Sequence, residues 1–481
     1  MNTTIIRNGT LVTATDVMQA DLALRGGKVA AIGRDLHGDI ELDATGLLVF
    51  PGGVDPHVHL QYPQGPNRVV SSDDWLTGTI AAAHGGTTTV LDFVEARPGQ
   101  TWMQALEARL GEAEPQAVID FSFHMTFNRT DAESLAEVPE VLRAGLTSFK
   151  IYMAYDGIRL NEAQMVTALA VLARHGGLPI VHAENHHVIM HLVKEQLAQG
   201  HTAPRWHPHT RPARGEAEAT ERILSLAQIV GAPLHIVHVT AAEGLDSIRR
   251  FRQHYGAQFT GEVCPQHLLL TEALYDQDGF EPAKYGMAPP LRTAEDCTAM
   301  WAGLQNGDLE FVVTDHCAFT LAQKRGQRRT PEFRRLPSGT VSNPPEAPWS
   351  EQLPPVNQIP GGGPGIETRV PLLYHFGVNE GRLSLNEFVR LSSTAAAQRF
   401  GLYPRKGTLA PGADADIVLF DPKHEVTLNA EGLHQNCDYT PYEGMRVRGW
   451  PRTVLSRGEV IMRDGQWVGA PGRGQFLRRV W

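Results

Sequence analysis

Hydrophobic and polar positions follow two different patterns along this chain of 481 residues. Short apolar runs separated by turn residues occupy residues 1 to about 46, as in Ile5-Ile6 and Asp21-Leu-Ala-Leu24. The same texture returns near the C-terminus, in residues 415–420 and 453–455. Runs of this length between turn residues are typical of β-strands. The two ends therefore predict one small β module built from both termini.

In the middle of the chain, apolar β-like runs alternate with amphipathic helical patterns. The candidate strands end near Phe50, Phe93, Thr126, Met153, Ala183, Val239, Val263 and Asp315. The candidate helices cover residues 75–84, 103–112, 133–144, 162–175, 217–230, 241–254 and 294–306, and a closing helix covers residues 385–400. Such alternation indicates βα units, and eight of them favour a (β/α)8 barrel over an open, doubly wound sheet. We expect the β module to use residues 1–50 and 405–481, and the barrel residues 51–404.

Composition narrows the possible partners. The net charge of -10 is spread along the chain without a basic stripe, which argues against nucleic acid as a partner. The four cysteines are far apart, which argues against a disulfide framework and favours the reducing cytoplasm. We find no apolar run of about 18 residues, so a membrane-spanning helix is not expected. A small, soluble substrate fits this composition best.

Reactive side chains gather at the predicted strand ends. One apolar run ends in Asp55-Pro-His-Val-His59, and others end at His182, His238 and Asp315. His57 and His59 are two residues apart, so a strand places them on one face. Taken singly, His57 and His59 are equally consistent with two unrelated surface histidines. His182 and His238 in apolar strands are more often hydrogen-bonded core histidines, and Asp315 could be a helix N-cap or a surface carboxylate. Because strand ends of a barrel meet at one rim, the whole set predicts a divalent-cation site.

Lys150 lies between Phe149 and Ile151 at another of these strand ends. A lysine in this position extends to solvent, pairs with an acid or loses its charge on burial. A neutral amine can add carbon dioxide to form a carbamate, which has two oxygens and one negative charge. Lys150 therefore has the chemistry needed to bridge two metal ions.

A series of motifs in a fixed order resembles the hydantoinase and dihydropyrimidinase family of the amidohydrolase superfamily. The motifs are Asp55-Pro-His-Val-His59 and residues 148–155, 181–185, 237–240, 261–266, 288–292, 314–317, 362–367, 402–407 and 414–418. Residues 472–479 are similar to bacterial phenylhydantoinases, the D-hydantoinase type, in particular. The resemblance covers nearly the whole chain, and it implies a (β/α)8 barrel, a terminal β-sandwich and a binuclear zinc centre.

The resemblance also implies roles for particular residues. One Zn²⁺ is expected on His57, His59 and Asp315 and the other on His182 and His238, with Lys150 as a bridging N6-carboxylysine. A metal-bridging hydroxide would attack the ring carbonyl, Tyr155 would donate a hydrogen bond to the oxyanion, and Asp315 would pass the proton to the leaving nitrogen. The product would be an N-carbamoyl amino acid. A homo-oligomer is expected, with a tetramer favoured.

Substrate contacts are expected from two loops and several side chains. The main chain at Ala288 and Gly361 would bind the ring, although the family usually has Ser-Pro-Pro and Pro-Asn-Gly there. Tyr152, Arg159 and Cys317 are expected near the ring or its substituent. We favour Cys317 as a small pocket wall and Arg159 as a side chain in water; the alternative is that Arg159 selects an acidic or polar substituent.

The sequence also leaves other functions open. Allantoinase and dihydroorotase are the nearest rivals, but dihydroorotases tend to have arginine where this chain has Gln61. A non-catalytic scaffold is the alternative from another class. Glu262 and His124 are expected as core groups or supports of the ligands. Surface positions are expected for His84, His186, His187, His207 and His209. Residues 324–369 form an irregular segment, in which residues 338–355 resemble an insertion that could serve as a lid or oligomer contact.

Overall fold

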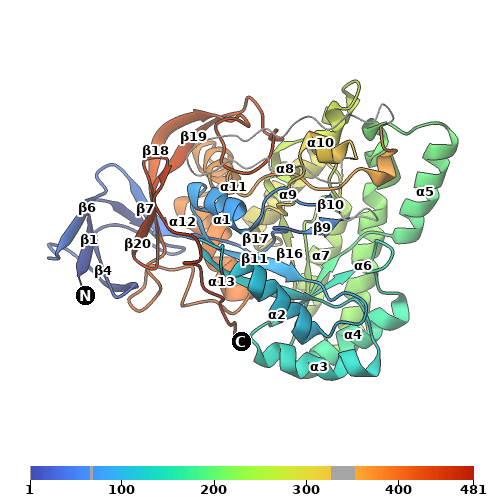
Figure 1. Cartoon of the computed structure of the whole chain (residues 1–481), viewed down its shortest axis with the longest axis horizontal. Helices are drawn as coiled ribbons and strands as arrows, with labels where there is room; N and C mark the ends of the chain where they lie inside the picture. The colour runs from blue at the N-terminus through green and yellow to red at the C-terminus, as the bar shows by residue number, and fades with distance from the viewer. Residues whose placement is uncertain (1, 65–68, 327–352, 481) are drawn as a thin grey trace.

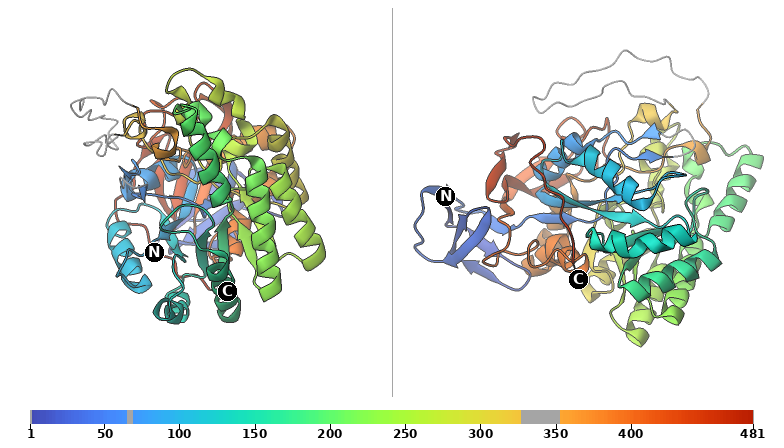
Figure 2. Two further views of the ribbon diagram at one scale, coloured as in Figure 1. Left: turned by 90° about the vertical axis from the view of Figure 1, so that its right-hand side faces the viewer. Right: turned by 60° about the horizontal axis from the view of Figure 1, so that its bottom comes forward.

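The computed structural model describes residues 2–64, 69–326 and 353–480. Two β-sheets lie at one end of the molecule, and a larger body of strands wrapped by helices forms the rest (Figure 1). The N-terminal strands lie at the far side of these sheets from the helical body in two further views (Figure 2).

The body is built on one eight-stranded sheet whose strands are all parallel to their neighbours. In sheet order the strands are β17 (Phe311–Val312), β16 (Phe259–Val263), β15 (Leu234–Ile236), β14 (Leu178–His182), β13 (Ser148–Tyr152), β12 (Asp120–Thr126), β11 (Thr87–Val94) and β8 (Gly53–Asp55). The two edge segments approach each other through a bridge between Val58 and His316, where the His59 backbone N–H donates to the His316 carbonyl oxygen at 2.8 Å. The predicted (β/α)8 barrel is confirmed.

Helices surround this sheet. They are α1 (Trp75–His84), α2 (Trp102–Ala113), α3 (Ala132–Arg143), α4 (Glu162–His175), α5 (His186–Ala198), α6 (Ala213–Val230), α7 (Ala242–Tyr255) and α9 (Ala294–Asn306). Local sequence sets their ends: the Asn161 side chain accepts from the Gln164 backbone N–H to start α4, and Gly176 ends it at φ 77°. The predicted helices match α1, α4 and α9 in full. Helix α5 was not predicted.

The first barrel strand differs from the prediction. Phe50 lies in β7 (Leu48–Pro51), which belongs to a terminal sheet, and the barrel strand begins at Gly53. A Cβ atom on Gly52 would lie 2.0 Å from the Thr88 hydroxyl oxygen, so only glycine allows the chain to pass here between the two sheets. One apolar run in the sequence therefore serves two sheets.

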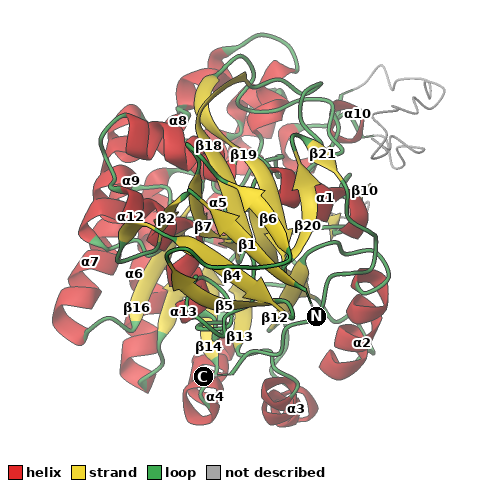
Figure 3. Ribbon diagram, turned by 90° about the vertical axis from the view of Figure 1, so that its left-hand side faces the viewer, coloured by secondary structure: helices red, strands yellow, loops and turns green. Residues whose placement is uncertain are grey.

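The terminal sheets combine both ends of the chain. One sheet has four strands, all N-terminal: β5 (Lys28–Gly33), β4 (Asp21–Arg25), β1 (Thr3–Arg7) and β6 (Ile40–Asp43). The other has seven, in the order β21 (Gln466–Trp467), β20 (Glu459–Arg463), β19 (Arg446–Ser456), β18 (Ile417–Thr427), β7, β2 (Thr10–Val12) and β3 (Val17–Gln19). Figure 3 shows these strands in front of the helices. The predicted module from both termini is confirmed, and its boundaries at residues 50 and 405 stay a prediction.

Shorter elements connect the barrel to the C-terminal strands. They are α10 (Leu321–Lys324), α11 (Arg369–Leu373), α12 (Leu385–Val389) and α13 (Ala395–Arg399), with a π-helical stretch at Arg390–Thr394 that joins the last two. The predicted closing helix over residues 385–400 corresponds to this joined run. Most of the expected insertion at residues 338–355 lies outside the described residues.

Candidate metal centre

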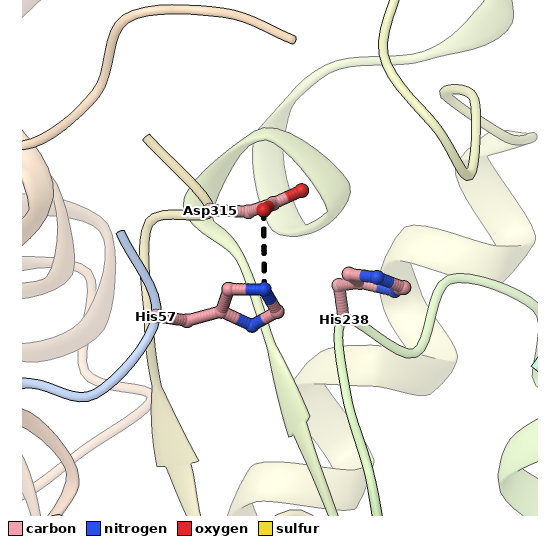
Figure 4. A group of neighbouring side chains, drawn as sticks. All are labelled: His57, His238 and Asp315. Carbon is pink, nitrogen blue, oxygen red and sulfur yellow. Dashed lines mark ion pairs between the residues drawn. The ribbon is translucent and has the colours of Figure 1, made fainter. Parts of the chain in front are cut away.

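Six side chains from five strand ends meet at one end of the barrel. His57 and His59 follow β8, Lys150 lies in β13, His182 ends β14, His238 follows β15, and Asp315 follows β17. All are buried except Asp315, whose side chain is 17% exposed. Figure 4 shows His57, His238 and Asp315 converging from separate segments. The parallel sheet explains the convergence, because its strands all end at the same rim.

The distances place these groups within reach of shared cations. The Nε2 atoms of His57 and His59 each lie 3.2 Å from Asp315 Oδ1, and Lys150 Nζ lies 3.5 Å from His57 Nε2. Ligand atoms of His57, His238 and Asp315 lie within 4.8 Å of one another. His182 Nδ1 faces His238 Nε2 at 2.9 Å. The six residues therefore form one continuous cluster.

The His57 ring indicates that a cation fits here. Its Nδ1 atom lies 2.5 Å from Glu262 Oε1, and burial lowers the pKa of His57 well below its usual value. A neutral ring that donates to Glu262 through Nδ1 directs the lone pair of Nε2 toward Asp315 Oδ1. Two electron-rich atoms facing each other at 3.2 Å repel unless a cation lies between them. Buried His59 Nδ1 and His238 Nδ1 also have no hydrogen-bond partner within the described chain.

His182 is oriented in a similar way by a second carboxylate. His182 Nε2 lies 2.8 Å from Glu184 Oε2, so Nδ1 is left to face the centre of the cluster. Burial opposes ionisation of Glu184, but the guanidinium of Arg211 and the bond to His182 outweigh it and lower the pKa of Glu184 to about 2. Glu184 is therefore an anion that holds the His182 ring in one tautomer.

Lys150 is fully buried beside aromatic rings. Its ammonium nitrogen lies 5.0 Å from the ring centroids of both Phe93 and Tyr152. Burial lowers the pKa of Lys150 to about 8, against the opposing effect of Asp315 and Glu262. A lysine with this pKa is neutral in about one tenth of the molecules at pH 7, and only the neutral amine can add carbon dioxide.

The backbone is strained at several of these positions. Tyr155, His238 and Asp315 adopt positive φ values of 76°, 38° and 52°. Non-glycine residues in this region cost about 1–3 kcal/mol each and concentrate at functional sites. The strain is consistent with backbone that is shaped for the site rather than for stability.

Two of the residues expected near the substrate, Tyr155 and Tyr152, lie beside this cluster. The Tyr155 ring lies 5.0 Å from the His182 ring, and Tyr152 lies 6.0 Å from it. Burial raises the pKa of Tyr155 above its usual value, so its hydroxyl stays protonated. Cys317 is buried and packs against Val69 and Phe319. Arg159 lies 3.5 Å from Asp156 Oδ1, with its side chain 26% exposed.

A buried lysine joins the two loops expected to bind the ring. The Nζ atom of Lys324 donates to the carbonyl oxygens of Gly286 (3.2 Å), Pro360 (2.9 Å) and Gly362 (2.9 Å). Ala288 and Gly361 lie one or two residues from these carbonyls. The ammonium group of Lys324 therefore links the segment before Ala288 to the segment around Gly361. The two segments are also joined directly, because the Gly362 N–H donates to the Gly286 carbonyl oxygen.

Sequence reasoning missed several of these supporting groups. Glu184, Arg211 and Lys324 carried no prediction, although Glu184 is two residues from His182 and a strand-like spacing would have placed it beside that histidine. Glu262 and His124 were expected as supports or core groups, and both are fully buried. The expected surface position is wrong for His84 and His186, which are 2% and 8% exposed, because α1 is buried along nearly its whole length and His186 lies on the buried side of α5.

Comparisons with known proteins identify the class of this fold and site. The amidohydrolase family matches residues 48–461. D-hydantoinase from Geobacillus stearothermophilus is 43% identical, over 99% of this chain and 97% of its own. A solved D-hydantoinase has a TM-score of 0.92 at 41% identity, with 99% of both chains covered. A solved dihydropyrimidinase from Brevibacillus agri NCHU1002 has a TM-score of 0.91 at 39% identity, over 99% of this chain and 98% of its own.

The chain therefore belongs to the amidohydrolase family and is an enzyme. Within that family its relatives are the hydantoinases and dihydropyrimidinases, so the resemblance expected from the sequence is confirmed. Among the described residues, no helix is long and apolar enough to cross a membrane.

Proposed function

We propose that this enzyme hydrolyses the cyclic amide bond of hydantoins or dihydropyrimidines and releases N-carbamoyl amino acids, with zinc as the working metal. The full-length similarity to D-hydantoinase and dihydropyrimidinase supports the reaction class. The observation that carries the proposal is the pair of imidazole nitrogens, from His57 and His59, that face one carboxylate oxygen of Asp315 at 3.2 Å. Such a donor set suits a borderline divalent cation.

The ligands would divide into two sets. His57, His59 and Asp315 would hold one cation, His182 and His238 the other, and carboxylated Lys150 would be shared between them. When bound, such cations lower the pKa of a water molecule to about 7 and polarise a carbonyl group. The lowered pKa of Lys150, about 8, supports its carboxylation. Glu262 and Glu184 would keep the rings of His57 and His182 in the tautomers that binding requires.

Two side chains would act directly on the substrate. The protonated hydroxyl of Tyr155 would donate a hydrogen bond to the oxygen that gains negative charge as the ring amide is attacked. Asp315 is the only one of the six proposed ligands with appreciable exposure, at 17%, so its carboxylate is the one best placed to take a proton from the attacking water. It would then return this proton to the ring nitrogen that leaves.

Ring recognition would come mainly from the main chain. The backbone at Ala288 and Gly361 would bind the amide groups of the ring, and Lys324 would hold the two segments together. Cys317 and Tyr152 would form the nearby wall. Arg159 is paired with Asp156 and partly exposed, which supports a position in water rather than a contact with the ring substituent.

The rival hypotheses predict different outcomes. An allantoinase-like enzyme would open allantoin in preference to hydantoin. Gln61 argues against a dihydroorotase, because its side chain has no guanidinium. A non-catalytic scaffold would lack stoichiometric metal, but all six candidate ligands are present and grouped.

The test is ring opening of hydantoin, 5-phenylhydantoin, dihydrouracil and allantoin, with and without added zinc. Opening of hydantoins or dihydrouracil that depends on zinc is expected. If zinc-replete protein opens none of the four rings, the proposal is wrong.

We also propose a cytoplasmic location and a homo-oligomeric assembly for this enzyme. All four cysteines are buried thiols, which is consistent with a cytoplasmic enzyme. A homotetramer is proposed, and sedimentation equilibrium of the purified chain would measure it.

A further inference from the structure

His316 follows Asp315 in the chain, but its ring is bonded to a different part of the molecule. The backbone at Asp315 has a positive φ of 52°, and the carboxylate of that residue faces His57 and His59. The ring of His316 is fully buried and faces the loop of residues 361–366 instead. Both of its nitrogen atoms have partners there or in the chain behind it.

The Nδ1 atom of His316 accepts two hydrogen bonds from this loop. The backbone nitrogen atoms of Gly365 and Ile366 lie 3.1 and 3.3 Å from it, and all three residues are buried. Because Nδ1 accepts from two N–H groups, it carries a lone pair, and the ring proton lies on Nε2. The ring can hold the loop only in this tautomer.

Asp73 keeps the ring in that tautomer. Its Oδ2 atom lies 3.0 Å from His316 Nε2, and both side chains are fully buried. Its other oxygen, Oδ1, accepts from the backbone N–H of Asn436 at 2.8 Å, so the carboxylate is itself fixed in place. A carboxylate that accepts the Nε2 proton leaves Nδ1 available to the loop.

The loop has further attachments on either side of Gly363. The Cys317 N–H donates to the Gly363 carbonyl oxygen at 3.2 Å, and His316 forms an isolated β-bridge with Gly363. A Cβ atom on Gly362 would lie 2.5 Å from the Cys317 carbonyl oxygen, so the backbone passes too close for a side chain at this position. Lys324 holds the Gly362 carbonyl oxygen. The loop is therefore fixed by Lys324 before Gly363 and by His316 after it.

We propose that His316 is a positioning residue for substrate binding, which holds the loop so that the main chain at Gly361 can bind the ring. This role rests on the function proposed above, in which Gly361 contacts the cyclic amide. A main-chain contact depends on how the backbone is held, and a loop that is already ordered binds without the cost of ordering. His316 does not touch the reacting atoms, so its loss should weaken substrate binding more than turnover.

Two substitutions separate the roles of the two ring nitrogens. His316→Asn places a side-chain oxygen near the position of Nδ1, where it can still accept from the loop. His316→Gln places its amide group near the position of Nε2, where it can reach Asp73 but not the loop. With hydantoin or dihydrouracil, His316→Gln is expected to raise KM about tenfold, because two buried N–H groups lose their acceptor. Zinc content should be unchanged, and kcat should stay within about threefold of the wild type. His316→Asn should keep KM within about threefold of the wild type.

Hydrogen exchange adds a measurement that does not depend on turnover. Exchange of the backbone amides of residues 361–366, followed by mass spectrometry on the zinc-loaded full-length enzyme, should be faster in His316→Gln than in the wild type or His316→Asn. Asp73→Asn, which removes the charge that keeps the proton on Nε2, should shift exchange and KM in the same direction as His316→Gln. His254→Gln is the matched control, because His254 is exposed in the last turn of α7, the end that leads into β16 and lies away from the rim. It should change neither quantity.

A purely structural role for His316 in closing the barrel predicts a different result. Both His316 variants would then lose zinc or unfold at a lower temperature, and KM would not change. Unchanged KM and exchange in His316→Gln, or equal increases of KM in His316→Gln and His316→Asn, would overturn the proposed role. Zinc-replete wild type that opens no ring would overturn the proposed function instead, so the two failures are distinguishable.

Discussion

Replacing Glu262 by glutamine tests how much the carboxylate behind His57 contributes to metal binding. Glu262 Oε1 lies 2.5 Å from His57 Nδ1, and Oε2 lies 3.0 Å from His235 Nε2, with all three side chains buried. Glutamine keeps the shape and one carbonyl oxygen but removes the negative charge. Partners of this kind typically contribute about 10- to 100-fold to metal affinity, or about 1.4–2.7 kcal/mol. We expect the zinc affinity to fall within that range.

The assay is a zinc titration in competition with a chromophoric chelator. Glu310→Gln is the matched control, because Glu310 pairs with Arg399 and precedes β17, at the opposite end of that strand from Asp315. Equal affinities for wild type and Glu262→Gln, or equal losses in both variants, would refute the reasoning.

Three further predictions concern the active centre. Tyr155→Phe should lower kcat by about 10²- to 10³-fold with unchanged zinc content, and full turnover in this variant would exclude the oxyanion role. Metal-free enzyme supplied with constant zinc and dissolved carbon dioxide should regain activity about tenfold more slowly at pH 6 than at pH 7. The reason is that the pKa of Lys150 is about 8 and only its neutral amine reacts with carbon dioxide. A reactivation rate that does not change with pH would contradict this. Lys324→Met should raise KM by about tenfold while zinc content is retained, whereas Lys284→Met, which removes a lysine paired with Glu281, should leave KM unchanged.

The supporting groups were harder to predict than the ligands, for a physical reason. The proposed ligands lie at strand ends, and a parallel barrel places all such ends at one rim whatever the details of packing. Arg211 and Lys324 reach the site from segments outside the strands, so their contacts depend on how loops fold over the rim. His84 shows the same limit: its place at the end of a helix is visible in the sequence, but its burial against His434 is not.

The order of strands and helices, and the reactive residues at the strand ends, were determined by the sequence itself, because periodicity and spacing are local properties. Only the tertiary structure shows that the apolar run around Phe50 contributes strands to two different sheets. The chain passes from one sheet to the other at Gly52, which lies against Thr88. The orientation of the His57 ring likewise depends on Glu262, a carboxylate 205 residues away in the sequence. Contacts of this kind follow from tertiary packing, which no local pattern specifies.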